Sequence, residues 1–152
     1  MNSFSSILNA PATASVRPPA VPGGHYIMLV RGLPRQDKSS KKGTEFIEYT
    51  TAILQPYVNE NGDCDVDAQA LEEFGTVQGK EMFLTFYMTE KSAYRHTEFL
   101  RDDLGLDVEG QTHWEAAQSA PGGQFIGFVR QKPRDDGKGV ISEIGGTAPL
   151  PA

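Results

Sequence analysis

The residues best suited to chemistry in this chain are basic, and most of them fall in two short segments. Segments 31–42 and 130–138 hold nine of the fourteen Lys and Arg residues and only three acids, whereas the 152-residue chain has a formal charge of −6. The nine bases are Arg31, Arg35, Lys38, Lys41, Lys42, Arg130, Lys132, Arg134 and Lys138. Such a separation of charge can steer a polyanion to one edge of an acidic body. Solvated polar loops would give the same pattern, so the fold has to decide between the two interpretations.

Other residue types offer little catalytic chemistry. The acidic turn 59–67 invites a calcium-loop interpretation, but the alignment puts Cys64 where glycine is needed and Ala70 where the bidentate glutamate belongs. The three histidines lack the spacing of zinc ligands, and His96 falls on the apolar side of a predicted helix, at the edge of the core. No G-x-S-x-G, Walker or G-x-G-x-x-G motif is present. We therefore predict a non-catalytic protein with no metal site and no cofactor.

The elements that must position the bases are predicted to be strands. Alternation of apolar and polar residues indicates five of them, at 25–32, 44–54, 80–88, 124–131 and 139–144. The run 133–137 joins the last two strands, and Gly137 in it is typical of a tight hairpin turn. The bases therefore lie in the connections that leave the first strand and join the last two.

Three helices are expected between the strands. The first begins after Asp67 as N-cap and stops at Gly75, and the clearest begins after Thr89 and ends at Gly105. A shorter helix opens at 112–115, which matches a capping box. Strand, strand, strand, helix, strand, strand is the order of the OB-fold, a five-stranded Greek-key barrel. We predict a mainly β, α+β domain with an OB-fold-like antiparallel barrel, and the alternative is a generic antiparallel sheet packed by helices.

Under this fold, the two basic segments coincide with the loops that frame the oligonucleotide-binding face of an OB-fold. Lys and Arg in these loops would neutralise phosphates and give salt-dependent, sequence-tolerant affinity. Nucleic-acid bases stack on flat aromatic rings. The predicted stacking residues are Tyr49, Tyr87 and Phe128, and further candidates are Phe83 and Phe86. Because neighbouring side chains on a strand point to opposite faces, either Phe86 or Tyr87 should be exposed.

Several motifs between residues 20 and 147 resemble those of one family. They are Pro-Gly-Gly-His-Tyr at 22–26, Lys-Ser-Ser-Lys-Lys-Gly-Thr at 38–44, Phe-Ile-Glu-Tyr at 46–49, Phe-Tyr-Met-Thr-Glu-Lys at 86–91 and Phe-Leu-Arg-Asp-Asp-Leu-Gly at 99–105. In these residues the chain resembles phage-encoded single-stranded-DNA-binding proteins of the OB-fold type. The resemblance implies a viral, DNA-binding protein that coats single strands in DNA replication or recombination inside the host cytoplasm.

The remaining sequence predicts how the chain is divided and where it works. Residues 1–23 are rich in Ala, Ser and Pro, which predicts an extended arm before a single domain at 24–147 and a short tail at 148–152. No stretch approaches the roughly 20 apolar residues of a membrane span, and residues 1–17 lack the pattern of a signal peptide. We therefore expect a cytoplasmic protein without membrane contact.

A different function is also compatible with these features. The N-terminal arm and the overall acidity fit a phage virion structural or assembly protein that uses the same fold for protein contacts. The sequence leaves open whether RNA replaces DNA, whether the chain forms a homo-oligomer, and whether the arm has a protein partner.

Overall fold

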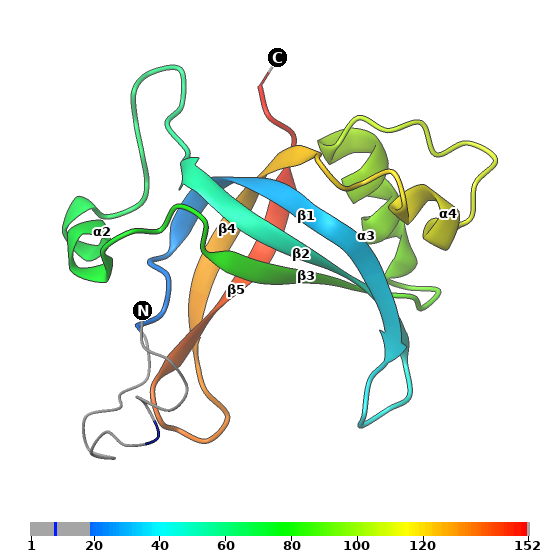
Figure 1. Ribbon diagram of the computed structural model, residues 1–152, viewed down its shortest axis with the longest axis horizontal. Helices are drawn as coiled ribbons and strands as arrows, with labels where there is room; N and C mark the ends of the chain where they lie inside the picture. The colour runs from blue at the N-terminus through cyan, green and yellow to red at the C-terminus, as the bar shows by residue number, and fades with distance from the viewer. Residues whose placement is uncertain (1–7, 9–18, 152) are drawn as a thin grey trace.

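A five-stranded antiparallel sheet forms the centre of the protein, as seen in a computed structural model that describes Leu8 and residues 19–151 (Figure 1). Its strand order is β3-β2-β1-β4-β5. The strands are β1 (Gly24–Lys38), β2 (Glu45–Pro56), β3 (Glu81–Tyr87), β4 (Gln124–Pro133) and β5 (Val140–Ala148). The predicted α+β class with mainly β structure is confirmed. Within the described residues no ladder joins β3 to β5, so the sheet is not closed into a barrel.

The two faces of the sheet differ because side chains alternate along each strand. On β2, Ile47 and Tyr49 are buried, while Phe46, Glu48 and Thr50 between them keep partial exposure. We call the solvent side of β1, β2 and β3 the outer face. The inner face packs against the segment that links β3 to β4, so the core lies between the sheet and that segment (Figure 1).

Strand β1 is longer than predicted because it continues past a bulge. Arg31 pairs with Thr50 and Arg35 with Glu48, so the three residues 32–34 of β1 lie opposite the single residue Tyr49 of β2. Gly32 adopts a φ of 75°, and Pro34, which has no N–H to give to a ladder, is accommodated there. Glycine and proline end most strands, which is why the sequence predicted a stop at residue 32. The bulge instead lets β1 continue to Lys38 and carry more of the basic segment.

The first helix has its predicted limits, whereas the helix predicted after Thr89 begins later than expected. Helix α2 (Ala68–Phe74) begins after Asp67, whose side chain accepts a hydrogen bond from the Ala70 amide, and stops at Gly75, as expected. The long helix predicted to begin after Thr89 begins instead at Ala93 as α3 (Ala93–Glu98), because residues 89–92 form a turn closed by the Thr89 carbonyl and hydroxyl.

Helix α3 continues as the π-helix η2 (Phe99–Asp103), which the sequence did not predict. The Leu104 amide donates to the Phe99 carbonyl, five residues back, and both Phe99 and Leu100 are buried. Gly105 ends the segment with a φ of 71°, as predicted. The last helix, α4 (His113–Ala117), has the predicted capping box between Thr112 and Glu115.

The end of the predicted arm, around Val21, packs on the domain. Val21 is buried, and its carbonyl accepts hydrogen bonds from Gln131 Nε2 at 3.0 Å and Ser142 Oγ at 2.8 Å. The rest of the predicted arm, 1–7 and 9–18, lies outside the described residues. At the other end, β5 reaches Ala148, the first residue of the predicted tail. No described helix has the length and apolar character needed to cross a membrane.

Candidate functional site

Strand β3 lies between the two basic regions of the protein. The hairpin β1–β2 lies beside its C-terminal end, where Tyr87 pairs with Phe46. The hairpin β4–β5 lies beside its N-terminal end, where Phe83 shares a hollow with Ile141. Figure 1 shows the two hairpins extending from different sides of the sheet, with β3 crossing between them. The two basic segments therefore flank one strand, although about 90 residues of sequence separate them.

Exposed aromatic rings follow the outer face along β3. Phe83 is 63% exposed and Tyr87 is 47% exposed. Because every second side chain of a strand points to the same face, Phe83 and Tyr87 lie on the same side of β3. Tyr87 meets the ring of Phe46 at 5.9 Å in an edge-on arrangement. The expectation that Phe86 or Tyr87 faces solvent is confirmed, since Tyr87 does so while Phe86 packs on the core.

Arginine side chains lie beside these rings, but the arginines form ion pairs with acidic side chains. The Arg35 guanidinium lies 5.3 Å from the centre of the Phe46 ring and forms ion pairs with Glu48 at 3.0 Å and Asp37 at 2.8 Å. Arg31 reaches Glu81 at 3.4 Å. Both arginine side chains are more than half exposed, although that of Glu48 is only 20% exposed, so a phosphate can compete for the arginines.

The lysines of the β1–β2 hairpin are not held by acids. Lys38, Lys41 and Lys42 are exposed and form no ion pair with any residue that the structure describes. The tip between the strands is fixed instead by its backbone, since the Ser39 amide donates to the Thr44 carbonyl at 2.8 Å and Gly43 adopts a φ of 66°. The hairpin therefore presents three ammonium groups on an ordered turn.

The bases of the β4–β5 hairpin are mostly paired. Glu143 accepts from Arg130 at 2.7 Å and from Lys132 at 2.9 Å, and both contacts hold the pKa of this carboxyl below its usual range, that of Lys132 more strongly. Arg134 pairs with Asp136 at 3.1 Å within the turn. Lys138 is exposed near the same turn. The second basic segment therefore carries less available charge than its composition suggests.

Two of the three predicted stacking residues, Tyr49 and Phe128, do not lie beside Tyr87 on the outer face. Tyr49 has no exposed surface, so the expectation that it offers its ring to a base is wrong; it lies on the inner side of β2. Phe128 is 38% exposed but lies opposite His25, at the other end of β1 from Arg35. Its ring packs on the His25 imidazole at 4.8 Å. Only Tyr87 joins the outer-face aromatic group.

Two rings of the outer face, Phe46 and Phe83, were not among the three predicted stacking residues. The signal for both was present, because Phe46 alternates with Glu48 and Thr50, which are polar, and Phe83 alternates with Glu81 and Thr85. Polar neighbours at i±2 indicate an outward face of a strand. The hydroxyl of a tyrosine is a weaker indicator, as the buried Tyr49 demonstrates.

A buried histidine cluster lies on the inner face and consists of Tyr49, His96 and His113. The Tyr49 hydroxyl lies 2.5 Å from His96 Nε2, and His96 Nδ1 lies 2.8 Å from His113 Nδ1. His96 is fully buried rather than at the core edge, and the fold brings it to His113 although their spacing in sequence indicated no such contact. Burial, and to a smaller extent the neighbouring His113, lower the pKa of His96 to about 4.

Hydrogen bonding in this cluster fixes where its protons sit. Burial raises the pKa of Tyr49, so its hydroxyl keeps its proton and donates it to the one acceptor that the described residues provide, His96 Nε2. His96 then carries its proton on Nδ1 and donates to His113 Nδ1. The neutral form of His113 consequently has its own proton on Nε2. No described residue accepts a hydrogen bond from that nitrogen.

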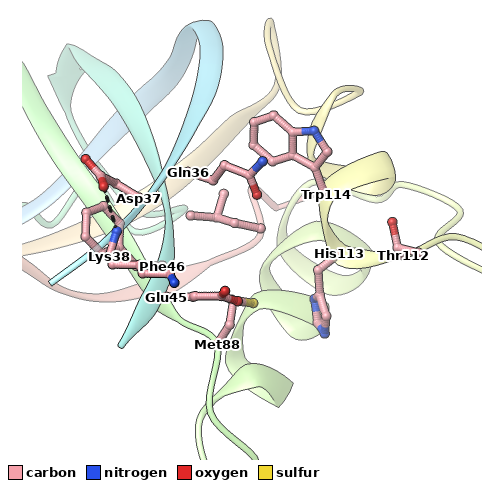
Figure 2. Close-up of a pocket in the computed structure, with 10 residues that line it drawn as sticks. Gln36, Asp37, Lys38, Glu45, Phe46, Met88, Thr112, His113 and Trp114 are labelled. Carbon is pink, nitrogen blue, oxygen red and sulfur yellow. Dashed lines mark hydrogen bonds between the residues drawn. The ribbon is translucent and has the colours of Figure 1, made fainter. Parts of the chain in front are cut away.

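A pocket of about 560 Å³ separates the β1–β2 hairpin from α4. Figure 2 shows Lys38, Glu45 and Phe46 on one side of it and His113 and Thr112 on the other, with Trp114 and Gln36 at one end. Gln36 and the buried Ile47 are partners across β1 and β2. The histidine cluster therefore extends from the core to the wall of this pocket.

The acids of the turn 59–67 have structural contacts. Asn59 Oδ1 accepts from the amides of Asn61 and Asp63, each at 2.9 Å. Asp65 accepts from the His25 amide at 2.8 Å and lies 2.6 Å from its Nδ1. Over Leu8 and residues 19–151, no three His, Cys, Asp or Glu side chains gather as they would to hold a metal ion.

No protein family matches this chain, and a search of curated proteins finds no significant relative. The geometry of the outer face and its two hairpins is therefore what indicates a function.

Proposed function

We propose that this protein binds single-stranded DNA without catalysing a reaction, through the outer face of the sheet and the two hairpins beside it. One observation carries the proposal: β3 presents the exposed rings of Phe83 and Tyr87 between two hairpins that together hold nine bases. Stacking on aromatic rings and neutralisation of phosphates are the two interactions by which proteins bind single strands without sequence preference. Coating of single strands in replication or recombination of phage DNA follows as the proposed role.

The strand order supports an OB-fold assignment as part of this proposal. An OB-fold barrel cut open between its third and fifth strands has the order β3-β2-β1-β4-β5, with its helix between strands three and four. OB-folds bind oligonucleotides over the face of strands two and three. Here that face is the one that carries Phe46, Phe83 and Tyr87.

The test is binding of a labelled oligo-dT, compared with a duplex of equal length, by fluorescence anisotropy at low and at physiological salt. We expect the single strand to bind more tightly and its affinity to fall steeply with salt. Replacing Phe83 or Tyr87 by alanine should weaken binding by about tenfold, since each base stack contributes roughly 1–3 kcal/mol. Tyr94→Ala is the matched control, because Tyr94 is 53% exposed but belongs to α3.

An absence of binding at low salt would overturn the proposal and favour the virion assembly function. Equal losses in Phe83→Ala, Tyr87→Ala and Tyr94→Ala would place the interface elsewhere.

A further inference from the structure

The pocket between the β1–β2 hairpin and α4 has features that the proposed function does not use. Its volume of about 560 Å³ falls in the range of small-molecule sites in proteins. It lies at the same end of β2 as the Phe46–Tyr87 pair, and Phe46 belongs both to its lining and to that pair. Phe46 therefore lies between the outer face and the pocket, which is lined on its other side by the buried Ile47 and by α4.

Polar groups around this pocket are available to a ligand. The side chains of Gln36, Lys38 and Glu45 form no hydrogen bond or ion pair with any described residue. The histidine cluster adds a donor, because the hydrogen bond from His96 directs the proton of neutral His113 to Nε2. The site thus combines an amide, which both donates and accepts, with an ammonium group, a carboxylate and an imidazole N–H.

One aromatic surface completes the site. Trp114 is half-buried beside these groups, and its indole is the largest flat side chain that lines the pocket. A planar ligand with a polar edge and an attached anion matches this combination: the plane stacks on the indole, the edge meets Gln36 and His113, and the anion meets Lys38. A nucleotide has these three parts.

We infer that this pocket takes one unstacked nucleobase of the bound single strand, with Trp114 as the stacking surface and Gln36 as the group that contacts the base edge. The inference rests on the proposed function. Capture of one nucleobase at this end of the outer face would fix the position of the bound DNA along β3. The remaining bases on Phe83 and Tyr87 would then occupy a defined register.

The test uses the fact that Trp114 is the only tryptophan of the chain. Thymidine 5′-monophosphate is titrated while Trp114 fluorescence is recorded with correction for absorption by the base, and deoxyribose 5-phosphate serves as the ligand without a base. We expect saturable quenching by the nucleotide with a Kd on the order of 1 mM, and none by the sugar phosphate. Gln36→Ala should weaken the nucleotide about fivefold, as loss of a hydrogen bond does. Tyr94→Ala, on α3, should leave the titration unchanged.

The outcomes separate this inference from the proposed function. Quenching that does not saturate, or that Gln36→Ala leaves unaltered, overturns the inference. Binding of oligo-dT without saturable quenching by the nucleotide also overturns it and leaves the proposed function standing. Saturable quenching without any binding of oligo-dT overturns the proposed function, and with it the inferred origin of the base from a bound strand.

Discussion

The outer face and the buried histidine cluster both consist of polar and aromatic side chains, but water reaches only the outer face. Arg35 and Lys41 lie in solvent, where ion pairs contribute about 0–1 kcal/mol and partners exchange easily. Tyr49 and His96 have no exposed surface, and each proton in their hydrogen bonds has one position. Exposure therefore decides the consequence of a substitution: changes on the outer face should alter affinity, whereas changes in the cluster should alter stability and its dependence on pH.

The largest expected effect concerns His96 and pH. The folded-state pKa of His96 is about 4, below the ordinary value of about 6.5, so between these values the unfolded chain binds one proton more than the folded protein. The contribution of His96 to the free energy of unfolding is complete above about pH 6.5. It is lost as the pH falls toward 4, and the total loss is about 3 kcal/mol. His96→Gln keeps an acceptor for Tyr49 and removes the titration. Urea unfolding at several pH values should therefore show a flatter pH profile for the variant.

Tyr49→Phe is the companion variant for this measurement. It removes the hydroxyl but leaves His96 buried, so it should keep the steep pH profile of the original protein. Oligo-dT affinity should fall with salt at the same rate in both variants. The distinction between the outer face and the histidine cluster would fail in either of two cases. In the first, His96→Gln leaves the pH profile of unfolding unchanged; in the second, it alters the salt dependence of oligo-dT binding.

The second effect concerns the three lysines of the β1–β2 hairpin. Replacement of Lys38, Lys41 and Lys42 by glutamine should weaken oligo-dT binding by roughly 30-fold at physiological salt. The slope of log K against log salt should fall by about 2, because each lost phosphate contact on a single strand accounts for about 0.7. The free energy of unfolding should change by less than about 0.5 kcal/mol, as is usual for surface positions.

A charge-matched control shows whether position or net charge matters. Gln55→Glu, Asn61→Asp and Gln78→Glu together make the same change in net charge at exposed residues away from the tip of the hairpin, where the three lysines lie. Binding by this variant should stay within about threefold of the original protein, since charges beyond about 8 Å are largely screened at physiological ionic strength. Equal weakening by both triple variants would mean that net charge, not the hairpin, governs binding.

The sequence predicted the strands and turns well because their signals are local. All five strands, the capping box at Thr112, the N-cap Asp67 and the helix stops at Gly75 and Gly105 follow from alternation and from turn chemistry within a few residues. The continuation of β1 past Gly32 was missed, since glycine and proline give the same local signal in a bulge and at a strand end. The π-helix at Phe99 was missed for a similar reason, because one residue added to a turn barely alters the apolar spacing.

The candidate site depends on contacts that no local pattern reveals. Arg130 and Lys132 counted as available bases until the structure placed Glu143 between them. His96 and His113 are 17 residues apart, and only the fold of the segment between β3 and β4 brings their rings together. The sequence therefore predicted which segments carry charge, but pairing across strands decides how much of that charge a ligand meets.

The smallest expected effect tests this pairing directly at Glu143. Its carboxyl keeps a lowered pKa beside Lys132 and Arg130, so it stays charged at neutral pH and occupies both bases. Glu143→Gln should release them and strengthen oligo-dT binding by about threefold, comparable to an exposed ion pair. Glu72→Gln on α2 removes an equal charge from an exposed acid elsewhere and should have no such effect. If both variants bind alike in anisotropy titrations, the β4–β5 hairpin is not part of the interface, and the bound strand must run only from Phe83 to the lysines of the β1–β2 hairpin.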